Sequence, residues 1–476
     1  MSAVDAVYRR LPIPLQNGLL TAKGLQFRME RRGFGNSARD AELAAAERLD
    51  ADEADALQLR LLRAFVEHAA RTSLAHGRAF AAARVSADSL NSLDDLRRLP
   101  VLEKAALRGH TGDYRSSAAP GYLVPMHTSG TTGSPLAVGV TLEDMRRRTA
   151  VLERAYGWFG VGPFDRNVRF SGHTIFPEAE RNGVFWRHNY AASQMLMSSY
   201  HLHEANLDRY IEALARFQPA RIDGYPSSIA LIARRMLRND ERRIRPLLVM
   251  PTAETLEDHQ REVIAEAFGC PVSNQYASSE GAPFACEDEG GELALFPTTG
   301  IIEVVRPGTD EPVAPGDDGE LLVTGFSTHA YPLIRYRIGD TGVMAGRTTQ
   351  RPGFRRLLSI TGRREDYIVS PERGPVGRLT PVFKALPSSI VEGQIAQISA
   401  DAVEVRYVPD PTQFRPEHLD RLRQEIEARL GRMEVRFVPY ARRLPRGPSG
   451  KLRAVIGLSE AAVRSASADE RGEPVG

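Results

Sequence analysis

Short β-forming runs alternate with helical segments from about residue 120 to residue 276, and this alternation constrains the fold more than any other feature. The β-forming runs end at turn residues and cover Tyr122–Met126, Arg221–Gly224, Leu247–Met250 and Pro271–Tyr276. Helices are expected between and after them, over Leu142–Tyr156, Asn206–Phe217, Ser228–Leu237 and Leu256–Phe268. Strands separated by helices predict an α/β fold with a largely parallel sheet, because parallel strands need long crossover connections.

Different patterns flank this region. Residues 1 to about 115 carry apolar positions at three- and four-residue spacing among strong helix formers, which predicts a mainly helical start. Three later runs, Ile301–Val305, Glu320–Thr324 and Val343–Ala345, predict antiparallel strands of a β-rich subdomain.

A second domain is expected after a boundary near Thr361–Asp366. The pattern after this boundary predicts a small α+β unit, with strands at Val403–Val408 and Val435–Val438 and an amphipathic helix at His418–Leu430. We therefore expect a large domain over residues 1–361 and a small C-terminal domain over residues 362–476. The tail from about residue 464 is polar and is expected to be disordered.

The composition argues against several classes of protein. Basic and acidic residues nearly balance, 62 against 60, so nucleic acid and anionic membrane surfaces are not expected partners. Two cysteines are too few for a disulfide framework, and no apolar run reaches the roughly 18 residues that a membrane span needs. Two prolines break the segment after Arg9 and Arg10, so we expect no signal peptide and a cytoplasmic location.

A loop rich in glycine and hydroxyl residues follows the first β-forming run. It reads His127-Thr-Ser-Gly-Thr-Thr-Gly-Ser-Pro135, and its N–H groups and hydroxyls can surround phosphate oxygens. It lacks the Gly-Lys-Ser/Thr ending of a Walker loop. By composition alone such a cluster is more often a surface loop, so its weight comes from the order of its residues.

The ordered string resembles the phosphate loop of the acyl-adenylate-forming superfamily, which includes acyl-CoA synthetases, luciferases and the adenylation domains of peptide synthetases. Four further segments match that superfamily in the same order across residues 127–453. The resemblance implies that residues 1–361 are an adenylation domain, that the C-terminal domain is mobile, and that ATP and Mg²⁺ are cofactors. The residues implied to bind the phosphates are Thr128, Ser129, Gly130, Thr131, Thr132 and Gly133.

The segment Tyr276-Ala-Ser-Ser-Glu280 resembles the Tyr-Gly-x-Thr-Glu motif of the superfamily. The resemblance implies that Tyr276 stacks on adenine, with Ala277 and Ser278 beside the nucleotide. It gives catalytic roles to Ser279, which would contact the α-phosphate, and to Glu280, whose carboxylate suits Mg²⁺. Ala277 replaces the usual Gly, and Ser279 replaces the usual Thr. Taken alone, Tyr276 would more often be a core residue and Glu280 a solvated carboxylate.

Two later segments match the ribose site and the hinge of the superfamily. Tyr336-Arg-Ile-Gly-Asp340 implies that Asp340 accepts hydrogen bonds from both ribose hydroxyls. Thr361-Gly-Arg-Arg-Glu-Asp366 resembles the hinge, in which Arg363 reaches the nucleotide. Glu365 stands where the superfamily usually has Asp or Lys, so the pivot is either Glu365 or Asp366.

The segment Pro445-Arg-Gly-Pro-Ser-Gly-Lys451 resembles the C-terminal loop whose lysine bridges the substrate carboxylate and the α-phosphate. The resemblance makes Lys451 a catalytic residue, and a compact ammonium suits the neutralisation of two anions. Lysine occurs only at positions 23, 104, 384 and 451, and every other basic residue is arginine. A lysine kept in such a chain favours a functional role for Lys451 over a surface role.

The resemblance is strongest to the phenylacetate-CoA-ligase-like branch, in particular its CapK-like members, and extends nearly from end to end. It implies that Gly224 and Tyr225 bind the acyl substrate, although Tyr225, which precedes a proline, could equally be a packed turn residue. Ala253 and Glu254, within Pro251–Thr255, would line the nucleotide side.

Some members of this branch bind zinc through closely spaced cysteines and a histidine. Cys286 remains here, but Asp288 and Ala294 stand at two of the expected ligand positions. We therefore expect no zinc and interpret Cys286 as a structural thiol.

The resemblance implies a reaction in two steps. A small carboxylic acid attacks the α-phosphate of ATP and releases pyrophosphate, and a thiol of CoA or of a carrier protein then takes the acyl group. An amine acceptor and a homodimer both stay open. A rival hypothesis is transfer of AMP to a cofactor hydroxyl, as in the deazaflavin-adenylating synthetases, with His127 as the candidate base. A non-enzymatic scaffold is disfavoured by the intact Lys451, Glu280 and Asp340.

Overall fold

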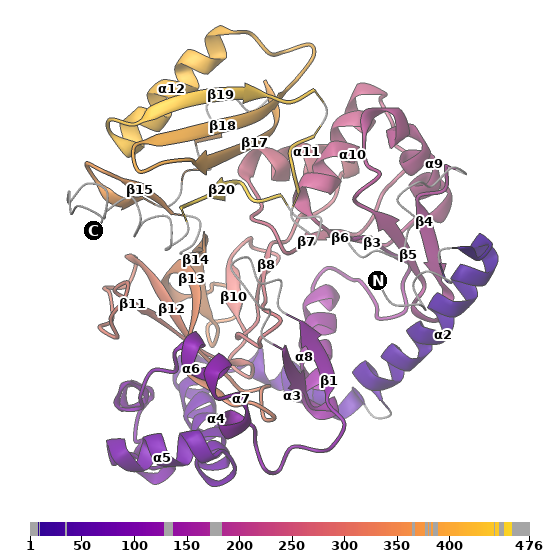
Figure 1. Cartoon of the computed structure of the whole chain (residues 1–476). Helices are drawn as coiled ribbons and strands as arrows, with labels where there is room; N and C mark the ends of the chain where they lie inside the picture. Colours follow the sequence, from indigo (N-terminus) through magenta and orange to yellow (C-terminus); the bar gives the residue numbers. More distant parts are fainter. Residues whose placement is uncertain are drawn as a thin grey trace.

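The computed structural model (Figure 1) describes residues 8, 10–33, 36–127, 137–171, 183–363, 367–376, 379, 382–383, 389–441, 443–446 and 452–458. Within these residues the α-helices are α2 (Ile13–Arg32), α3 (Asn36–Ala46), α4 (Ala51–Thr72), α5 (Leu74–Ala83), α6 (Lys104–Gly109), α7 (Thr111–Tyr114), α8 (Leu142–Gly157), α9 (Leu207–Phe217), α10 (Pro226–Arg238), α11 (Asp258–Phe268) and α12 (Glu417–Leu430). Short 3-10 turns are η1 (Ala87–Ser89), η2 (Leu93–Arg98), η3 (Tyr190–Ala192) and η4 (Glu204–Asn206).

The helix predictions are confirmed with small shifts at the ends. Helices α2 to α7 and two 3-10 turns make the start of the chain mainly helical. Helix α8 begins at Leu142, as predicted, because the Thr141 side chain accepts a hydrogen bond from the Asp144 N–H and caps the helix. Helix α10 begins two residues before the predicted Ser228, since Pro226 suits the first turn of a helix.

A five-stranded sheet forms the α/β centre of the molecule, and the prediction of a largely parallel sheet is confirmed. Its order is β4-β5-β3-β6-β7. The strands are β3 (Asn167–Ser171), β4 (Trp186–Asn189), β5 (Gln194–Ser198), β6 (Arg221–Gly224) and β7 (Leu248–Pro251). Strand β4 pairs antiparallel at the edge and the other neighbours pair parallel. Helices α9, α10 and α11 bury apolar side chains against this sheet in one core cluster.

One expected strand and the end of another lie outside that sheet, which corrects the prediction for those residues. The run from Tyr122 forms β1 (Val124–His127), and β1 pairs antiparallel with β2 (Ala137–Val140) in a sheet of its own. The 128–136 connection is shorter than the dozen or so residues that a parallel crossover needs. The run from Pro271 begins beside β7, as predicted, because Val272 forms a parallel bridge with Val249. Its end is β8 (Gln275–Tyr276), which pairs antiparallel with β9 (Ala285–Glu287), because the chain turns back after Glu280.

A seven-stranded antiparallel sheet follows in the chain, as predicted for residues 301–345. Its order is β11-β12-β13-β14-β10-β9-β8. The strands not yet named are β10 (Leu293–Leu295), β11 (Gly300–Val305), β12 (Asp318–Gly325), β13 (Leu333–Arg347) and β14 (Arg355–Arg363). Helix α4 packs on this sheet through Phe65 and Val66, which share a core cluster with Ile301 and Ile334.

The C-terminal unit is an α+β layer, as predicted. Strands β17 (Ile390–Gln397), β18 (Ala402–Pro409), β19 (Glu434–Pro439) and β20 (Val455–Ile456) form a sheet in the order β19-β18-β17-β20. Helix α12 covers it through Leu422, Ile426 and Leu430. A separate hairpin joins β15 (Ile368–Ser370) and β16 (Gly374–Val376). Figure 1 shows the unit, coloured orange to yellow, above the seven-stranded sheet and beside helices α10 and α11.

Two predictions about this region concern residues outside the described ranges. They are the pivot at Glu365 or Asp366 and the disordered tail from about residue 464. The division into domains at residues 361 and 362 stays a prediction. Among the described helices, none is long and apolar enough to cross a membrane.

Candidate active site

The carboxyl ends of β6 and β7 form one border of the site. Gly224 ends β6 opposite Pro251 of β7, and Tyr225 follows as the N-cap of α10. Gly224 has a φ of 140°, and a Cβ there would lie 2.6 Å from the Cβ of Phe170, so the position requires glycine. Because ligands of parallel α/β sheets bind at this edge, the predicted substrate residues lie where a ligand is expected.

Ala253 and Glu254 follow β7 at the same edge. Ala253 has a φ of 70°, an uncommon conformation for a residue other than glycine. The side chain of Glu254 is only 6% exposed, and its carboxylate contacts Arg446 and the backbone of Leu452. Burial raises the pKa of Glu254, while the Arg446 guanidinium acts to lower it. The Glu254 carboxylate therefore faces the C-terminal segment.

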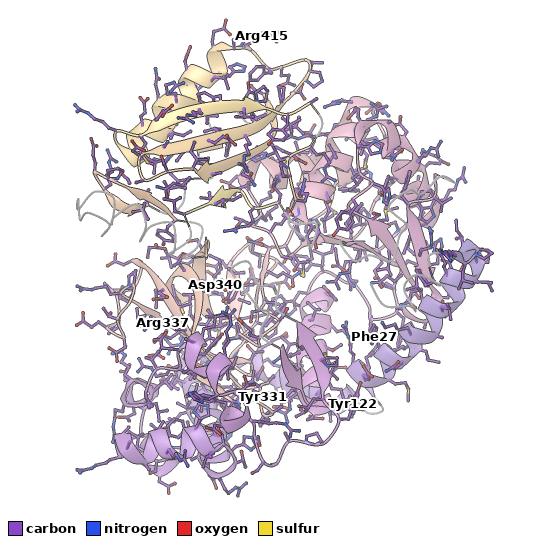
Figure 2. All side chains as sticks on the ribbon, viewed as in Figure 1. Phe27, Tyr122, Tyr331, Arg337, Asp340 and Arg415 are labelled. Atoms are coloured by element: carbon purple, nitrogen blue, oxygen red, sulfur yellow. The ribbon has the colours of Figure 1, made fainter. Side chains whose placement is uncertain are left out.

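The predicted adenine and ribose residues meet across the seven-stranded sheet. The Tyr276 hydroxyl donates to Asp340 Oδ2 at 2.9 Å, which joins β8 to β13. The backbone of Arg363 on β14 lies directly opposite Asp340. Figure 2 shows Asp340 near the end of the sheet that faces the C-terminal unit. The structure thus brings Tyr276, Asp340 and the Arg363 backbone into one place.

The predicted magnesium ligand Glu280 is buried and paired with a cation. Its Oε1 lies 3.1 Å from Lys104 Nζ and accepts from the Tyr336 hydroxyl at 3.4 Å. Burial is the main cause that raises the pKa of Tyr336 well above its usual range, and the charge of Glu280 adds to it. A neutral phenol and an ammonium therefore face the carboxylate.

Lys104 is a site residue that sequence reasoning missed. Leu102 forms a parallel bridge with Tyr336, and Leu102 N donates to Arg335 O at 3.1 Å. This pairing lays the chain along β13 and places Lys104, at the start of α6, over Glu280. The available signal was that Lys104 is one of four lysines in an arginine-rich chain, but no motif gave it a role.

A small cavity brings Glu280 close to the hairpin that carries the predicted phosphate loop. Its lining includes Glu280 together with Val140 of β2, Arg148 of α8 and Thr328. Arg148 Nη1 donates to the Ser279 carbonyl at 3.5 Å. Burial lowers the pKa of Arg148 to about 10, so the guanidinium stays charged at neutral pH.

A buried carboxylate ties α8 to the segment before β13. Asp144 accepts from the His329 N–H at 2.9 Å and lies 2.6 Å from His329 Nδ1. Burial acts to raise the pKa of Asp144, but hydrogen bonds from His329 and Thr141 outweigh it and hold the pKa below its usual value. This contact keeps Arg148, one turn further along α8, beside the site.

The residues between Tyr276 and Glu280 form a tight turn. Ser278 Oγ accepts from the N–H groups of Gly281 and Ala282 at 3.1 Å and 3.0 Å, so its hydroxyl stabilises the turn. The side chains of Ala277 and Ser279 are exposed. Ser279 is therefore the hydroxyl of this turn that is open to a ligand.

Several predicted site residues lie outside the described ranges. They are Thr128, Ser129, Gly130, Thr131, Thr132, Gly133, Glu365, Asp366 and Lys451, as are the side chains of His127 and Arg363. Of their described neighbours, His127 ends β1, and Leu452, directly after Lys451, donates its N–H to Glu254.

The region of the expected zinc ligands has other contacts. Cys286 is buried on β9 opposite Ala294 of β10, and burial raises the pKa of its thiol. Asp288 Oδ1 accepts from the N–H groups of Gly290 and Glu292, both at 3.0 Å. Across the described part of the chain, no group of three His, Cys, Asp or Glu side chains could hold a metal ion.

The side chains present fit a magnesium nucleotide. Glu280 offers a hard carboxylate oxygen that already faces a cation, and Mg²⁺ is usually bound by one or two carboxylates plus waters and phosphates. Asp340 offers acceptor oxygens suited to two hydroxyl donors. The acidic groups thus match both parts of the ligand, the metal and the ribose.

The family described as AMP-binding enzyme matches residues 65–329, and the CapK C-terminal domain matches residues 368–457. Protein CapK of Staphylococcus aureus is 33% identical over 367 residues, which cover 76% of this chain and 80% of that protein. Phenylacetate-coenzyme A ligase of Escherichia coli (strain K12) is 28% identical over 339 residues, covering 69% of this chain and 76% of that protein.

The family match and the ligase relatives together show an adenylate-forming enzyme of the AMP-forming acid–thiol ligase kind. The chain belongs to the AMP-binding enzyme family, in the branch of CapK and the phenylacetate-CoA ligases.

A solved ligase shares the fold. The 2-hydroxyisobutyryl-CoA ligase in its postadenylation state, in complex with R3-HIB-AMP, has a TM-score of 0.69 at 19% identity, covering 89% of this chain and 94% of that one. In its thioesterification state, with 2-HIB-AMP and CoA, the TM-score is 0.54 at 19% identity, covering 89% and 93%. The fold described here, with its C-terminal unit, is thus more similar to the postadenylation form.

Proposed function

We propose that this enzyme activates a small carboxylic acid as its acyl-AMP, releases pyrophosphate, and passes the acyl group to a thiol of CoA or of a carrier protein. One observation carries the proposal: the Tyr276 hydroxyl donates to Asp340, while Glu280, four residues after Tyr276, accepts from Tyr336, four residues before Asp340. Membership of the AMP-binding family supports the adenylation step, and the phenylacetate-CoA ligase relative supports a thiol acceptor.

Electrostatics explains why such a site suits this reaction. The attacking carboxylate and the α-phosphate are both anions and repel each other as they approach. The Lys451 ammonium would stand between them and neutralise both, which stabilises the transition state more than the separated reactants. Asp340 and Tyr276 would hold the ribose and adenine, so that the α-phosphate is presented in a fixed orientation. When bound by Glu280, Mg²⁺ would offset charge on the phosphates.

The remaining roles follow from position. The 128–133 loop would bind phosphate oxygens with Ser279, and Arg363 would reach the nucleotide from β14. Gly224 and Tyr225 would border the acyl pocket at the carboxyl end of β6. Rotation of the C-terminal domain about Glu365 or Asp366 would switch the enzyme between adenylation and acyl transfer. A cytoplasmic location, magnesium as the metal and the absence of zinc belong to the same proposal.

Transfer of AMP to a hydroxyl is the second candidate. An alcohol carries no charge that needs a bridging ammonium, and it requires a base near the phosphate loop, for which His127 is the candidate. The intact Lys451 in its Pro-Ser-Gly loop favours the carboxylate. No described contact distinguishes a thiol from an amine as the acceptor.

ATP–pyrophosphate exchange over a panel of aliphatic, aromatic and sugar acids tests the proposal. At least one acid should support exchange, and Lys451→Ala should lower the exchange rate about 100-fold, by analogy with the loss of one oxyanion donor. Lys23→Ala, an exposed lysine of α2, is the matched control and should exchange like the wild type. ATP-binding enzyme that exchanges with no acid but transfers AMP to an alcohol would replace this proposal with the second candidate.

A further inference from the structure

Residues on both sides of segment 447–451 contact one carboxylate of the larger part of the molecule. The Leu452 N–H donates to Glu254 Oε1 at 2.7 Å, and Arg446 Nη1 lies 3.5 Å from the same oxygen. The second oxygen of Glu254 accepts from the Ser227 N–H at 3.3 Å, and Arg446 Nη1 donates to Ser227 Oγ at 2.9 Å. We call these four residues, Ser227, Glu254, Arg446 and Leu452, the Glu254 junction.

The larger part of the molecule holds its half of the junction on regular structure. Glu254 follows β7 closely, and Ser227 lies in the first turn of α10. The N–H groups of a first helical turn have no partner within the helix, and the positive end of the helix dipole favours a carboxylate. The first turn of α10 therefore orients the Glu254 carboxylate independently of the C-terminal segment.

The C-terminal unit holds its half on strand β17. Arg446 pairs with Glu392, whose second oxygen accepts from the Leu444 N–H at 2.9 Å. Beyond the segment, Gln394 Nε2 donates to the Arg453 carbonyl at 2.7 Å. Side chains of β17 thus contact the chain on both sides of segment 447–451.

The junction is buried, and its charges alternate. The side chains of Glu254 and Arg446 are 6% and 11% exposed, and Glu392 is 5% exposed. One guanidinium therefore lies between two carboxylates, one from each part of the molecule. Hydrogen bonds to charged groups in such surroundings are stronger than neutral ones, so the junction favours this one arrangement of the two parts.

Building on the proposed function, we propose that Glu254 is a positioning residue for the adenylation step, because it holds Arg446 and Leu452 on either side of segment 447–451. The N–H that Glu254 binds belongs to the peptide bond between Lys451 and Leu452. Fixing this peptide restricts where the Lys451 ammonium can reach, although Glu254 itself touches no reacting atom. The carboxylate thus serves the contact between the two parts, whereas the resemblance assigned Glu254 to the nucleotide.

The first test measures docking without any acid. Hydrogen exchange of the full chain, read by mass spectrometry with residue-level fragmentation, follows the Leu452 amide. Glu254→Ala should speed its exchange about tenfold, the loss expected for one charge-assisted hydrogen bond. Glu254→Gln keeps an acceptor for the amide, so its exchange rate at Leu452 should lie between those of wild type and Glu254→Ala. Arg238→Ala is the matched control, because Arg238 joins the two parts elsewhere, at 3.2 Å from Asp410, and it should leave Leu452 unchanged. Equal exchange in wild type and Glu254→Ala would overturn the proposal.

The second test separates positioning from nucleotide binding. Calorimetry with ATP and Mg²⁺ should give the same Kd for Glu254→Ala and wild type. With an acid that supports exchange, Glu254→Ala should lower pyrophosphate exchange about tenfold or more, while thiolysis of supplied acyl-AMP stays within about twofold. A weakened Kd with unchanged Leu452 exchange would make Glu254 a nucleotide ligand, and an equal loss in both half-reactions would also overturn the proposal. Wild type that exchanges with no acid would count against the proposed function alone.

Discussion

Replacing Lys104 with methionine removes the cation that faces Glu280 and leaves a buried carboxylate beside one long hydrogen bond. The Glu280 side chain is 5% exposed and that of Lys104 is 27% exposed, with 3.1 Å between their charged atoms. Removing one partner of a buried ion pair costs about 3–5 kcal/mol. Because Lys104 is partly exposed, solvent screens the pair, and we expect a loss of about 2 kcal/mol.

A double-mutant cycle measures this coupling. Thermal unfolding of wild type, Lys104→Met, Glu280→Gln and the double variant should show that Lys104→Met is strongly destabilising only while Glu280 keeps its charge. ATP with Mg²⁺ should raise the melting temperature of Lys104→Met more than that of wild type, because the metal would supply the missing cation at Glu280. Lys23→Met in α2 is the control. Single effects that simply add in the double variant would refute the coupling.

Three further predictions concern the rest of the structure. Gly224→Ala should destabilise the enzyme by about 2 kcal/mol or more, because a φ of 140° and a contact of 2.6 Å with the Cβ of Phe170 both oppose a side chain; an unchanged melting temperature would contradict this. Burial lowers the pKa of His76 to about 4, so the unfolded chain, with a pKa near 6.5, binds more protons as the pH falls between these values. Stability should therefore drop by about 2 kcal/mol from about pH 7 to about pH 5, and His76→Gln should flatten that dependence in thermal unfolding. Burial raises the pKa of Cys270 to about 12 and that of Cys286 well above its usual value. Iodoacetamide at mildly alkaline pH should therefore label neither thiol before unfolding. Rapid labelling of the folded enzyme, measured by mass spectrometry, would contradict this prediction.

The parallel sheet could be predicted because its strands carry local signals. Strand β6 has the predicted bounds, Arg221–Gly224, since a β-forming run ends there at a glycine and a proline-initiated helix follows. Strand β1 was assigned to the wrong sheet because its composition says nothing about its partner. The partner depends on the length of the 128–136 connection and on contacts distant in sequence.

The site was predictable only where ordered motifs mark it. Tyr276 and Asp340 are 64 residues apart, yet each belongs to a motif, and the structure joins them. Lys104 and Glu280 come together through pairing of Leu102 with β13, a tertiary contact that no local pattern reports. The contacts of Glu254 with the C-terminal segment were equally hidden, because they depend on how the two parts of the molecule are arranged.

Activation of a carboxylate is the central claim, and oxygen transfer tests it most directly. An acid labelled with ¹⁸O in its carboxylate, chosen from those that support pyrophosphate exchange, is incubated with enzyme, ATP, Mg²⁺ and CoA. If the acid attacks the α-phosphate and the acyl group then leaves to the thiol, one carboxylate oxygen stays on phosphorus, and mass spectrometry should find one ¹⁸O in each AMP released. AMP without label, or AMP recovered as an ester of an alcohol, would contradict the claim.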